Sequence, residues 1–160
     1  MTSDGYIKIQ PNQAARISPM GLEIMQSFLS VAPLIFTAIG SLAVKGYKKT
    51  QLEELKKAHE RFRAASDVEV PQVMVLASHR FFEVLGEMAA SPYLEASFSR
   101  LLLDKARLDM LVLRPKGQLL KAKVVQCLQW QKQIMDAVEE QSEERVSLQM
   151  HRLFDSTCIN

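Results

Sequence analysis

The chain has 160 residues, of which 48% are hydrophobic and 24% charged, and a formal net charge of +2 at pH 7. This length and composition predict one globular domain with a core of its own and exclude an intrinsically disordered protein. The net charge is too small to indicate nucleic-acid binding by electrostatics alone. Cys127 and Cys158 belong to no CxxC or metal-ligand array, so we expect a reducing, cytoplasmic environment.

The N-terminal segment differs in kind from the rest of the chain. Tyr6, Ile7 and Ile9 have β-type composition, Pro11-Asn12 is a turn signal, and residues 15–17 are able to return as a second strand. These residues predict a short β-hairpin, and a tail without regular structure is the alternative that the sequence leaves open.

The next segment is a long apolar stretch, because Ile24 to Val44 contains no charged residue. About 20 apolar residues suffice to cross a bilayer, but serine, threonine, glutamine, glycine and proline residues dilute this stretch. No basic region precedes it, so it is not a signal peptide. We expect a helix from about Pro19 to Lys45, bent at Pro33, that is apolar on most sides because other helices wrap it, with no membrane insertion.

Two helices are predicted next. Lys45-Gly46 ends the first helix, and Thr50 is expected as the N-cap of the second, with Glu53 completing a capping box. The third helix begins after Pro71.

Three further helices complete the predicted fold. Ser91-Pro92 is expected to end the third helix and to open the fourth, as an N-cap followed by a first-turn proline. A break at residues 114–117 separates the fourth helix from the fifth, which covers about residues 118–140. Ser142 is the expected N-cap of a sixth helix that ends near Phe154. The fold class is therefore all-α, an antiparallel bundle of about six helices.

The third helix carries the most informative pattern in the sequence. Its apolar residues Phe81, Val84, Leu85 and Met88 recur at helical spacing. The segment WQKQIMDAV (residues 130–138) and the last helix follow it. Together these features resemble the FCD domain, the effector-sensing C-terminal domain of FadR-subgroup regulators in the GntR family, over roughly residues 20–156.

The N-terminal segment resembles a part of the same regulators. Its turn resembles the wing hairpin that ends their winged helix-turn-helix, although Ala14 stands where the family usually has glycine. About 17 residues before the bundle leave no room for a recognition helix. We therefore expect a fragment or a natural truncation that reaches DNA only through a winged helix-turn-helix absent from this chain. The expected units are residues 1–18 as tail or wing remnant, 19–156 as helical domain and 157–160 as tail.

The resemblance also implies positions for a metal site. Many FCD domains hold a divalent metal through an Asp and a His one turn apart on one helix and a His on each of the last two helices. Residues one turn apart share a helix face, so such ligands project into one cavity. The corresponding positions here are Ser78, Phe82, Gln131 and Leu153, with His151 two residues from the last. None is the usual ligand, so we expect no metal and no cofactor.

Loss of the metal changes the expected effector. The resemblance implies a small carboxylate or apolar acid, and its charge would need another partner in an apolar cavity. Arg107 is one candidate partner, as are Arg100, His79 and Arg80, although a solvated or salt-bridged surface role is the simpler explanation for each of them. The expected effector-pocket residues are Ser78, Phe82, Arg107, Gln131, His151 and Leu153.

These features predict the effector-sensing and dimerisation domain of a GntR-like transcriptional regulator, acting as a homodimer. The alternative is a helical protein-interaction module with a filled core and no small-molecule ligand. The sequence has no Gly-rich phosphate loop, GxSxG or HExxH motif, so we do not expect an enzyme.

Overall fold

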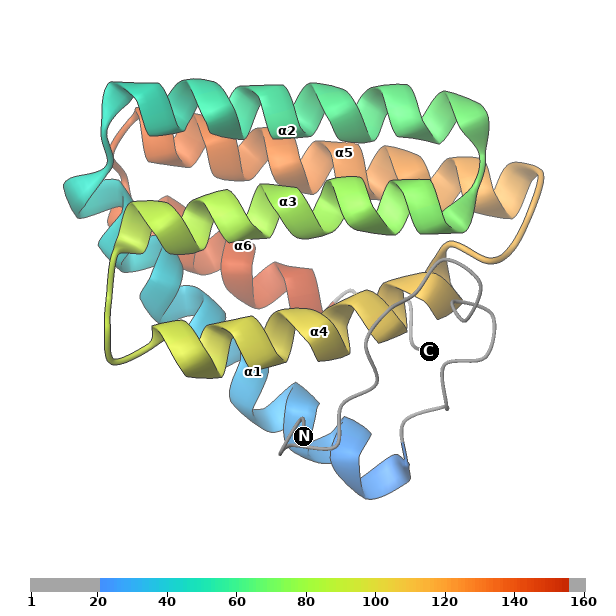
Figure 1. The fold of residues 1–160 in the computed structure, drawn as a ribbon, viewed down its shortest axis with the longest axis horizontal. Coiled ribbons are helices and arrows are strands. Elements are labelled where there is room, and N and C mark those ends of the chain that lie inside the picture. The colour runs from blue at the N-terminus through green and yellow to red at the C-terminus, as the bar shows by residue number, and fades with distance from the viewer. Residues whose placement is uncertain (1–20, 156–160) are drawn as a thin grey trace.

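The computed structural model describes residues 21–155, and this part of the chain is entirely helical apart from short connections. The all-α prediction is confirmed, whereas the predicted N-terminal hairpin lies outside the described residues. Figure 1 shows six helices packed as a bundle. Their bounds are α1 (Leu22–Gly46), α2 (Lys49–Val68), α3 (Pro71–Ala89), α4 (Glu95–Val112), α5 (Gln118–Glu139) and α6 (Glu143–Asp155).

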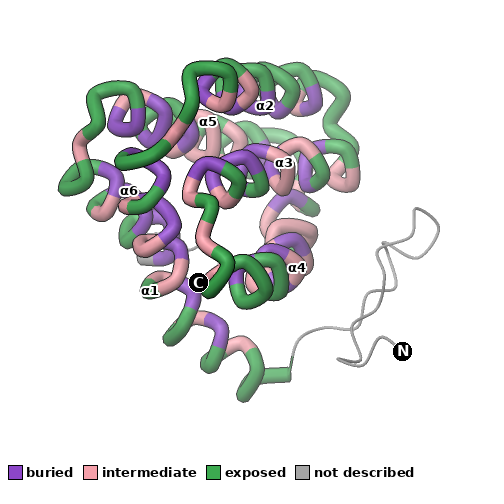
Figure 2. The backbone as a smooth tube through the Cα atoms, turned by 60° about the vertical axis from the view of Figure 1, so that its left-hand side comes forward, coloured by how far each residue is buried: buried purple, intermediate pink, exposed green. Residues whose placement is uncertain are grey.

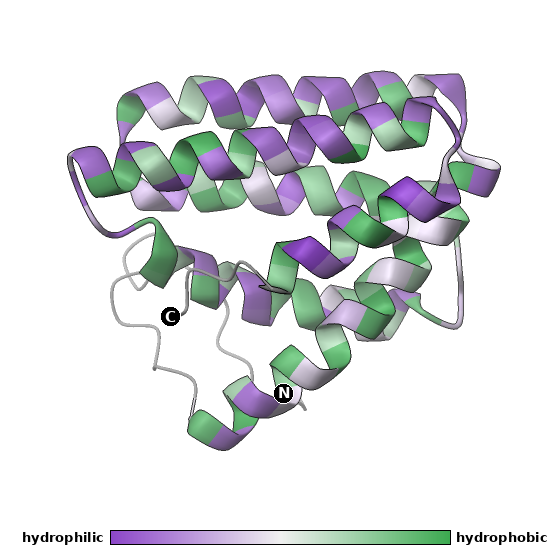
Figure 3. Ribbon diagram, turned by 180° about the vertical axis from the view of Figure 1, so that it is seen from behind, coloured by the Kyte–Doolittle hydropathy of each residue, from purple (hydrophilic) through white to green (hydrophobic). Residues whose placement is uncertain are grey.

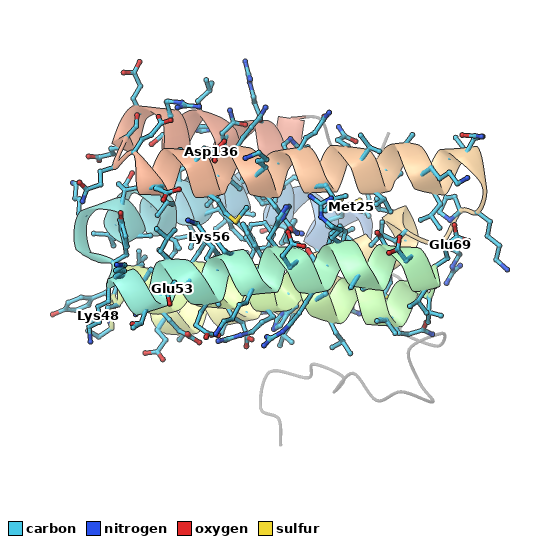
Figure 4. All side chains as sticks on the ribbon, turned by 90° about the horizontal axis from the view of Figure 1, so that it is seen from above. Met25, Lys48, Glu53, Lys56, Glu69 and Asp136 are labelled. Carbon is cyan, nitrogen blue, oxygen red and sulfur yellow. The ribbon has the colours of Figure 1, made fainter. Side chains whose placement is uncertain are left out.

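Short connections join successive helices, and one helix, α1, crosses the others obliquely. α2 and α3 form an antiparallel pair, α5 lies along α2, and α4 packs against α3 (Figure 1). α1 crosses the bundle obliquely and packs on α3 and α6. An ion pair of 3.1 Å between Lys56 Nζ and Glu139 Oε2 joins α2 to α5 at the surface, where Figure 4 labels Lys56.

Two of the predicted helix ends are confirmed. α1 ends at Gly46, as the Lys45-Gly46 signal predicted. The hydroxyl oxygen of Ser142 accepts a hydrogen bond of 3.2 Å from the backbone N–H of Arg145, which satisfies one of the unpaired donors at the start of α6.

Two other predicted ends are wrong. α2 begins one residue before Thr50, with Lys48 at the N-cap, and the Gln51 side chain accepts the Lys48 N–H at 2.8 Å in place of the predicted Thr50–Glu53 box. α4 begins at Glu95 and not at Ser91-Pro92. Ala90 is left-handed (φ 49°) and reverses the chain, and the Ser91 carbonyl then accepts the Leu94 and Glu95 N–H groups in a turn that precedes the helix.

The centre of the core is an aromatic cluster around Phe36 of α1. The Phe36 ring centroid lies 5.7 Å from that of Phe82 on α3, 5.0 Å from Phe98 on α4 and 5.0 Å from Phe154 on α6. Rings at these distances and in tilted or T-shaped arrangements attract one another beyond the burial of their area. The four positions that carried the α3 pattern, Phe81, Val84, Leu85 and Met88, are all buried.

α1 differs from its prediction in one respect. By length and composition it is apolar enough to cross a membrane, but only 39% of its most apolar window is buried in this fold. Figure 2 shows that its first turns project from the bundle and are mostly exposed, and Figure 3 that the helix is largely apolar. The expectation that other helices wrap α1 on most sides is therefore wrong. α1 lies at the edge of the bundle, with one face on α3 and α6 and an opposite face that leaves Leu34 66% exposed.

Candidate functional site

A cavity of about 60 Å³ lies where α3, α4, α5 and α6 meet, with one residue of α1 in its wall. Its wall is mainly apolar, with a few polar and charged groups, which is the usual character of a small-molecule site. The lining residues are Phe28, Ser78, Phe82, Lys105, Leu108, Asp109, Val112, Cys127, Trp130, Gln131, Leu153 and Phe154.

Four of the six residues expected in the pocket line this cavity. Ser78 and Phe82 lie one turn apart on α3, Gln131 comes from α5 and Leu153 from α6. All four are buried, with between 2% and 6% of their surface exposed. The fold thus brings together side chains that are up to 75 positions apart in the sequence.

The structure does not place His151 and Arg107 at the cavity. His151 is exposed, because the inward face of α6 is formed by Val146, Met150 and Leu153. The Arg107 guanidinium lies 3.5 Å from an Asp104 carboxylate oxygen on its own helix. Neither residue is among those that line the cavity.

An ion pair on α4 supplies the charged groups of the cavity instead. Lys105 Nζ lies 2.6 Å from Asp109 Oδ2, and the two side chains are only 12% and 21% exposed. The ammonium also lies 4.6 Å from the centroid of the Phe82 ring, within range of a cation–π attraction. The sequence contains an indication that Lys105 faces the core, because Lys105 lies between Leu101 and Leu108 in the apolar row of α4.

Gln131 is positioned by a histidine from another helix. His59 of α2 is buried, and its Nδ1 lies 2.9 Å from Gln131 Oε1. With the ring N–H donating to the amide oxygen, the Gln131 NH₂ group remains as a donor that this bond does not use. His59 is thus a satisfied core residue that orients one wall of the cavity.

Within residues 21–155, no three or more His, Cys, Asp or Glu side chains are grouped closely enough to hold a metal ion. At the cavity itself, Asp109 is the one carboxylate in the wall and its oxygen is engaged by Lys105. The donor set therefore does not fit the one Asp and three His of the expected family pattern.

A second and larger groove, of about 720 Å³, lies between α3 and the start of α4 and is as open to solvent as the first cavity. It is lined by Glu83, Glu87 and Glu95 together with apolar residues that include Phe98. Arg80 pairs with two of these glutamates, 3.6 Å from Glu83 and 2.8 Å from Glu87, and the Glu87 hydrogen bond raises the pKa of Arg80. Arg80 and Glu83 thus form the local ion pair that their spacing allowed. Two of the three glutamates of this groove, Glu83 and Glu87, are therefore paired with a cation.

Comparison with known families gives a match over three quarters of the chain. The family described as FCD domain matches residues 37–156, from the middle of α1 to the end of α6. No curated protein matches the sequence.

Proposed function

This chain belongs to the FCD domain family, the effector-binding and dimerisation domain of GntR regulators, and we propose that the cavity between α3, α4, α5 and α6 is its effector site. FCD domains are parts of transcriptional regulators and not enzymes. We further infer that the regulator belongs to the FadR subgroup, that its effector site works without a metal, and that it acts as a homodimer in the cytoplasm.

One observation carries the proposal. The four positions at which the family resemblance places metal ligands are Ser78, Phe82, Gln131 and Leu153, and all four line the same cavity. Their side chains cannot supply the imidazole and carboxylate ligands that suit zinc and similar ions. The position of the site is thus retained while its chemistry has changed from metal coordination to an apolar wall with neutral polar groups.

The volume and lining of the cavity limit the effector. A cavity of about 150 Å³ holds one benzene molecule, and this one has about 60 Å³. The cavity is partly open to solvent, so a molecule larger than this volume can enter with part of it outside. The fitting occupant is a small molecule with a short apolar part and a single polar end. A small carboxylic acid meets these conditions and finds a cation, Lys105, in the wall.

The exposed face of α1 supports the homodimer. Large apolar side chains along this helix are at least one third exposed, and apolar patches of this kind mark association surfaces. A second copy of the chain buries them in a two-fold interface, the commonest closed symmetry. These residues are Leu22, Ile24, Val31, Leu34 and Leu42.

α1 also supplies a physical link between the two proposed sites. Phe28 of this helix lines the cavity, while Ile24 and Val31, on neighbouring turns, are 53% and 44% exposed. An effector that moves Phe28 therefore moves the surface on which the copies meet. In a complete regulator this coupling changes how two winged helix-turn-helix domains are held on DNA.

Thermal unfolding of the full chain with straight monocarboxylic acids of two to six carbons tests the effector site. A ligand at a hundred times its Kd stabilises a protein by about 2.7 kcal/mol, which raises Tm by roughly 5–11 °C at this chain length. We expect such a shift with at least one acid. We also expect Phe82→Ala, which enlarges the cavity, to move the preference towards longer acids.

Phe81→Ala is the matched control. Phe81 is completely buried beside Phe82 but does not line the cavity, so its loss lowers Tm without changing the ligand preference. The alternative function, a protein-interaction module with a filled core, makes a different prediction. In that case no acid stabilises the wild type, and Phe82→Ala costs as much stability as Phe81→Ala, about 3–5 kcal/mol.

A further inference from the structure

The charged residues of the cavity wall form an ion pair on α4. Lys105 and Asp109 are the charged residues among those that line the cavity. Burying an ion pair is costly, and replacing such a pair by apolar residues of similar size is often neutral or stabilising. The Lys105–Asp109 pair, at 2.6 Å with side chains only 12% and 21% exposed, is part-buried and bears part of this desolvation cost, so its advantage for folding alone is small.

The geometry leaves the ammonium able to bind a second acceptor. An ammonium has three N–H donors. One donates to Asp109 Oδ2 at 2.6 Å, and the centroid of the Phe82 ring lies 4.6 Å from Nζ. Two neutral side chains of the same wall, Ser78 and Gln131, carry further donors, and the Gln131 oxygen is already engaged by His59. A carboxylate inside the cavity thus finds one cation and neutral donors from α3 and α5.

We propose that Lys105 is the anchor of the effector site and that Asp109 is an internal substitute for the effector's carboxylate. Without a ligand, Asp109 pairs with the part-buried ammonium. When a small monocarboxylate binds, its carboxylate takes the place of Asp109 on Lys105 Nζ, and Asp109, the more exposed partner, turns to water. One ion pair is exchanged for another, so no buried charge is left unpaired at either stage.

This inference rests on the proposed effector site but makes its own prediction. Because Asp109 competes with the ligand, removing its charge should strengthen binding of an acid and leave binding of the corresponding neutral amide unchanged. Removing the charge of Lys105 should weaken binding of the acid. If the ion pair only stabilises the fold, neither change should increase the affinity for the acid.

Calorimetric titration of the full chain with butanoate and with butanamide tests these signs. We expect Asp109→Asn to bind butanoate at least about tenfold more tightly than the wild type, the scale of one hydrogen bond to a charged group. Lys105→Met should bind butanoate at least about tenfold more weakly. Both variants should bind butanamide as the wild type does.

The chain offers a matched control pair on α5. Lys132 and Asp136 have the same residue types and the same spacing, with Nζ and Oδ1 3.5 Å apart, but the side chains are 64% and 41% exposed; Figure 4 labels Asp136. Lys132→Met and Asp136→Asn should change neither affinity. The double variant Lys105→Met with Asp109→Asn has no unpaired buried charge, so it remains informative if either single variant does not fold. It should lose the preference for butanoate over butanamide.

The outcomes distinguish failure of the Lys105 anchor assignment from failure of the effector site as a whole. If Asp109→Asn binds butanoate no better than the wild type, or if the double variant keeps the preference for the acid, the anchor assignment is overturned. Binding of butanamide but not butanoate by the wild type also overturns it, while the effector site itself stands. If none of the proteins binds either probe, both this inference and the effector site fail.

Discussion

Replacing Gly40 with alanine should separate α1 from α6. A Cβ atom at this position would lie 2.4 Å from Val146 Cγ1 and 3.3 Å from two atoms of the Met150 side chain. The methionine is flexible enough to adapt, but the branched valine is held on α6, so the two helices must move apart by about 1 Å to reach ordinary contact. Overpacking of a core costs about 1–3 kcal/mol, and the helical preference of alanine over glycine returns about 0.5–1 kcal/mol.

The midpoints of these two ranges give an expected net loss of about 1 kcal/mol for Gly40→Ala, which lowers Tm by roughly 2–4 °C for a chain of this size. Urea unfolding gives the free energy directly. Gly46→Ala is the control in the same helix, since nothing lies within 4 Å of its Cβ position, and it should be neutral or stabilising by up to about 1 kcal/mol.

A double variant identifies the cause of the loss. Val146→Ala removes the atom that clashes, so Gly40→Ala combined with Val146→Ala should be more stable than the sum of the two single effects predicts. If Gly40→Ala proves as stable as the wild type, or if the two changes are simply additive, the close contact of α1 and α6 described here is incorrect.

Three further predictions address assembly, metal and helix capping. In sedimentation velocity at micromolar concentration, Leu34→Glu should convert a homodimer to a monomer. Leu119→Glu, at an equally exposed position on α5, should leave the dimer intact. A monomeric wild type would contradict the proposed homodimer. Extensive treatment with a chelator should leave Tm unchanged, and elemental analysis should give far less than one equivalent of transition metal, because the cavity wall lacks the ligands; a stoichiometric metal would refute this. Ser142→Ala should cost about 1 kcal/mol in urea unfolding through loss of the N-cap of α6, and an unchanged free energy would show that the cap contributes nothing.

Much of the helical pattern could be predicted because apolar spacing depends on one helix at a time. Phe81, Val84, Leu85 and Met88 repeat at helical intervals, and that repeat alone determines which face of α3 is buried. Ser142 and Gly46 act on their own helix ends in the same local way. The start of α4 was predicted less well, because Ala90 adopts a left-handed conformation that its side chain does not indicate, and a turn therefore precedes the helix.

The site shows where reasoning from single helices fails. Ser78 and Phe82 are one turn apart, so their common face follows from spacing, but the charge of Arg107 does not determine which side of α4 it occupies. Lys105, two residues earlier, lies on the apolar row and in the cavity wall. A lysine on such a row is usually read as a surface residue, and only the packing of α3 on α4 shows that the Phe82 ring and Asp109 hold it inside.

The edge-to-face contact between Phe28 and Phe154 has a consequence for the kinetics of binding. These rings, with centroids 5.9 Å apart, come from the first turns of α1 and the last turn of α6, and both line the cavity. Helix ends open locally at far lower free energy than the centre of a bundle. A ligand is thus able to enter and leave when these two helix ends fray, while α2, α3 and α5 stay folded. Its residence time then depends on how often the two helix ends open. Amide hydrogen exchange should then slow on ligand binding in the first turns of α1 and the last turn of α6, and equal slowing along α2 would argue for access by global unfolding instead.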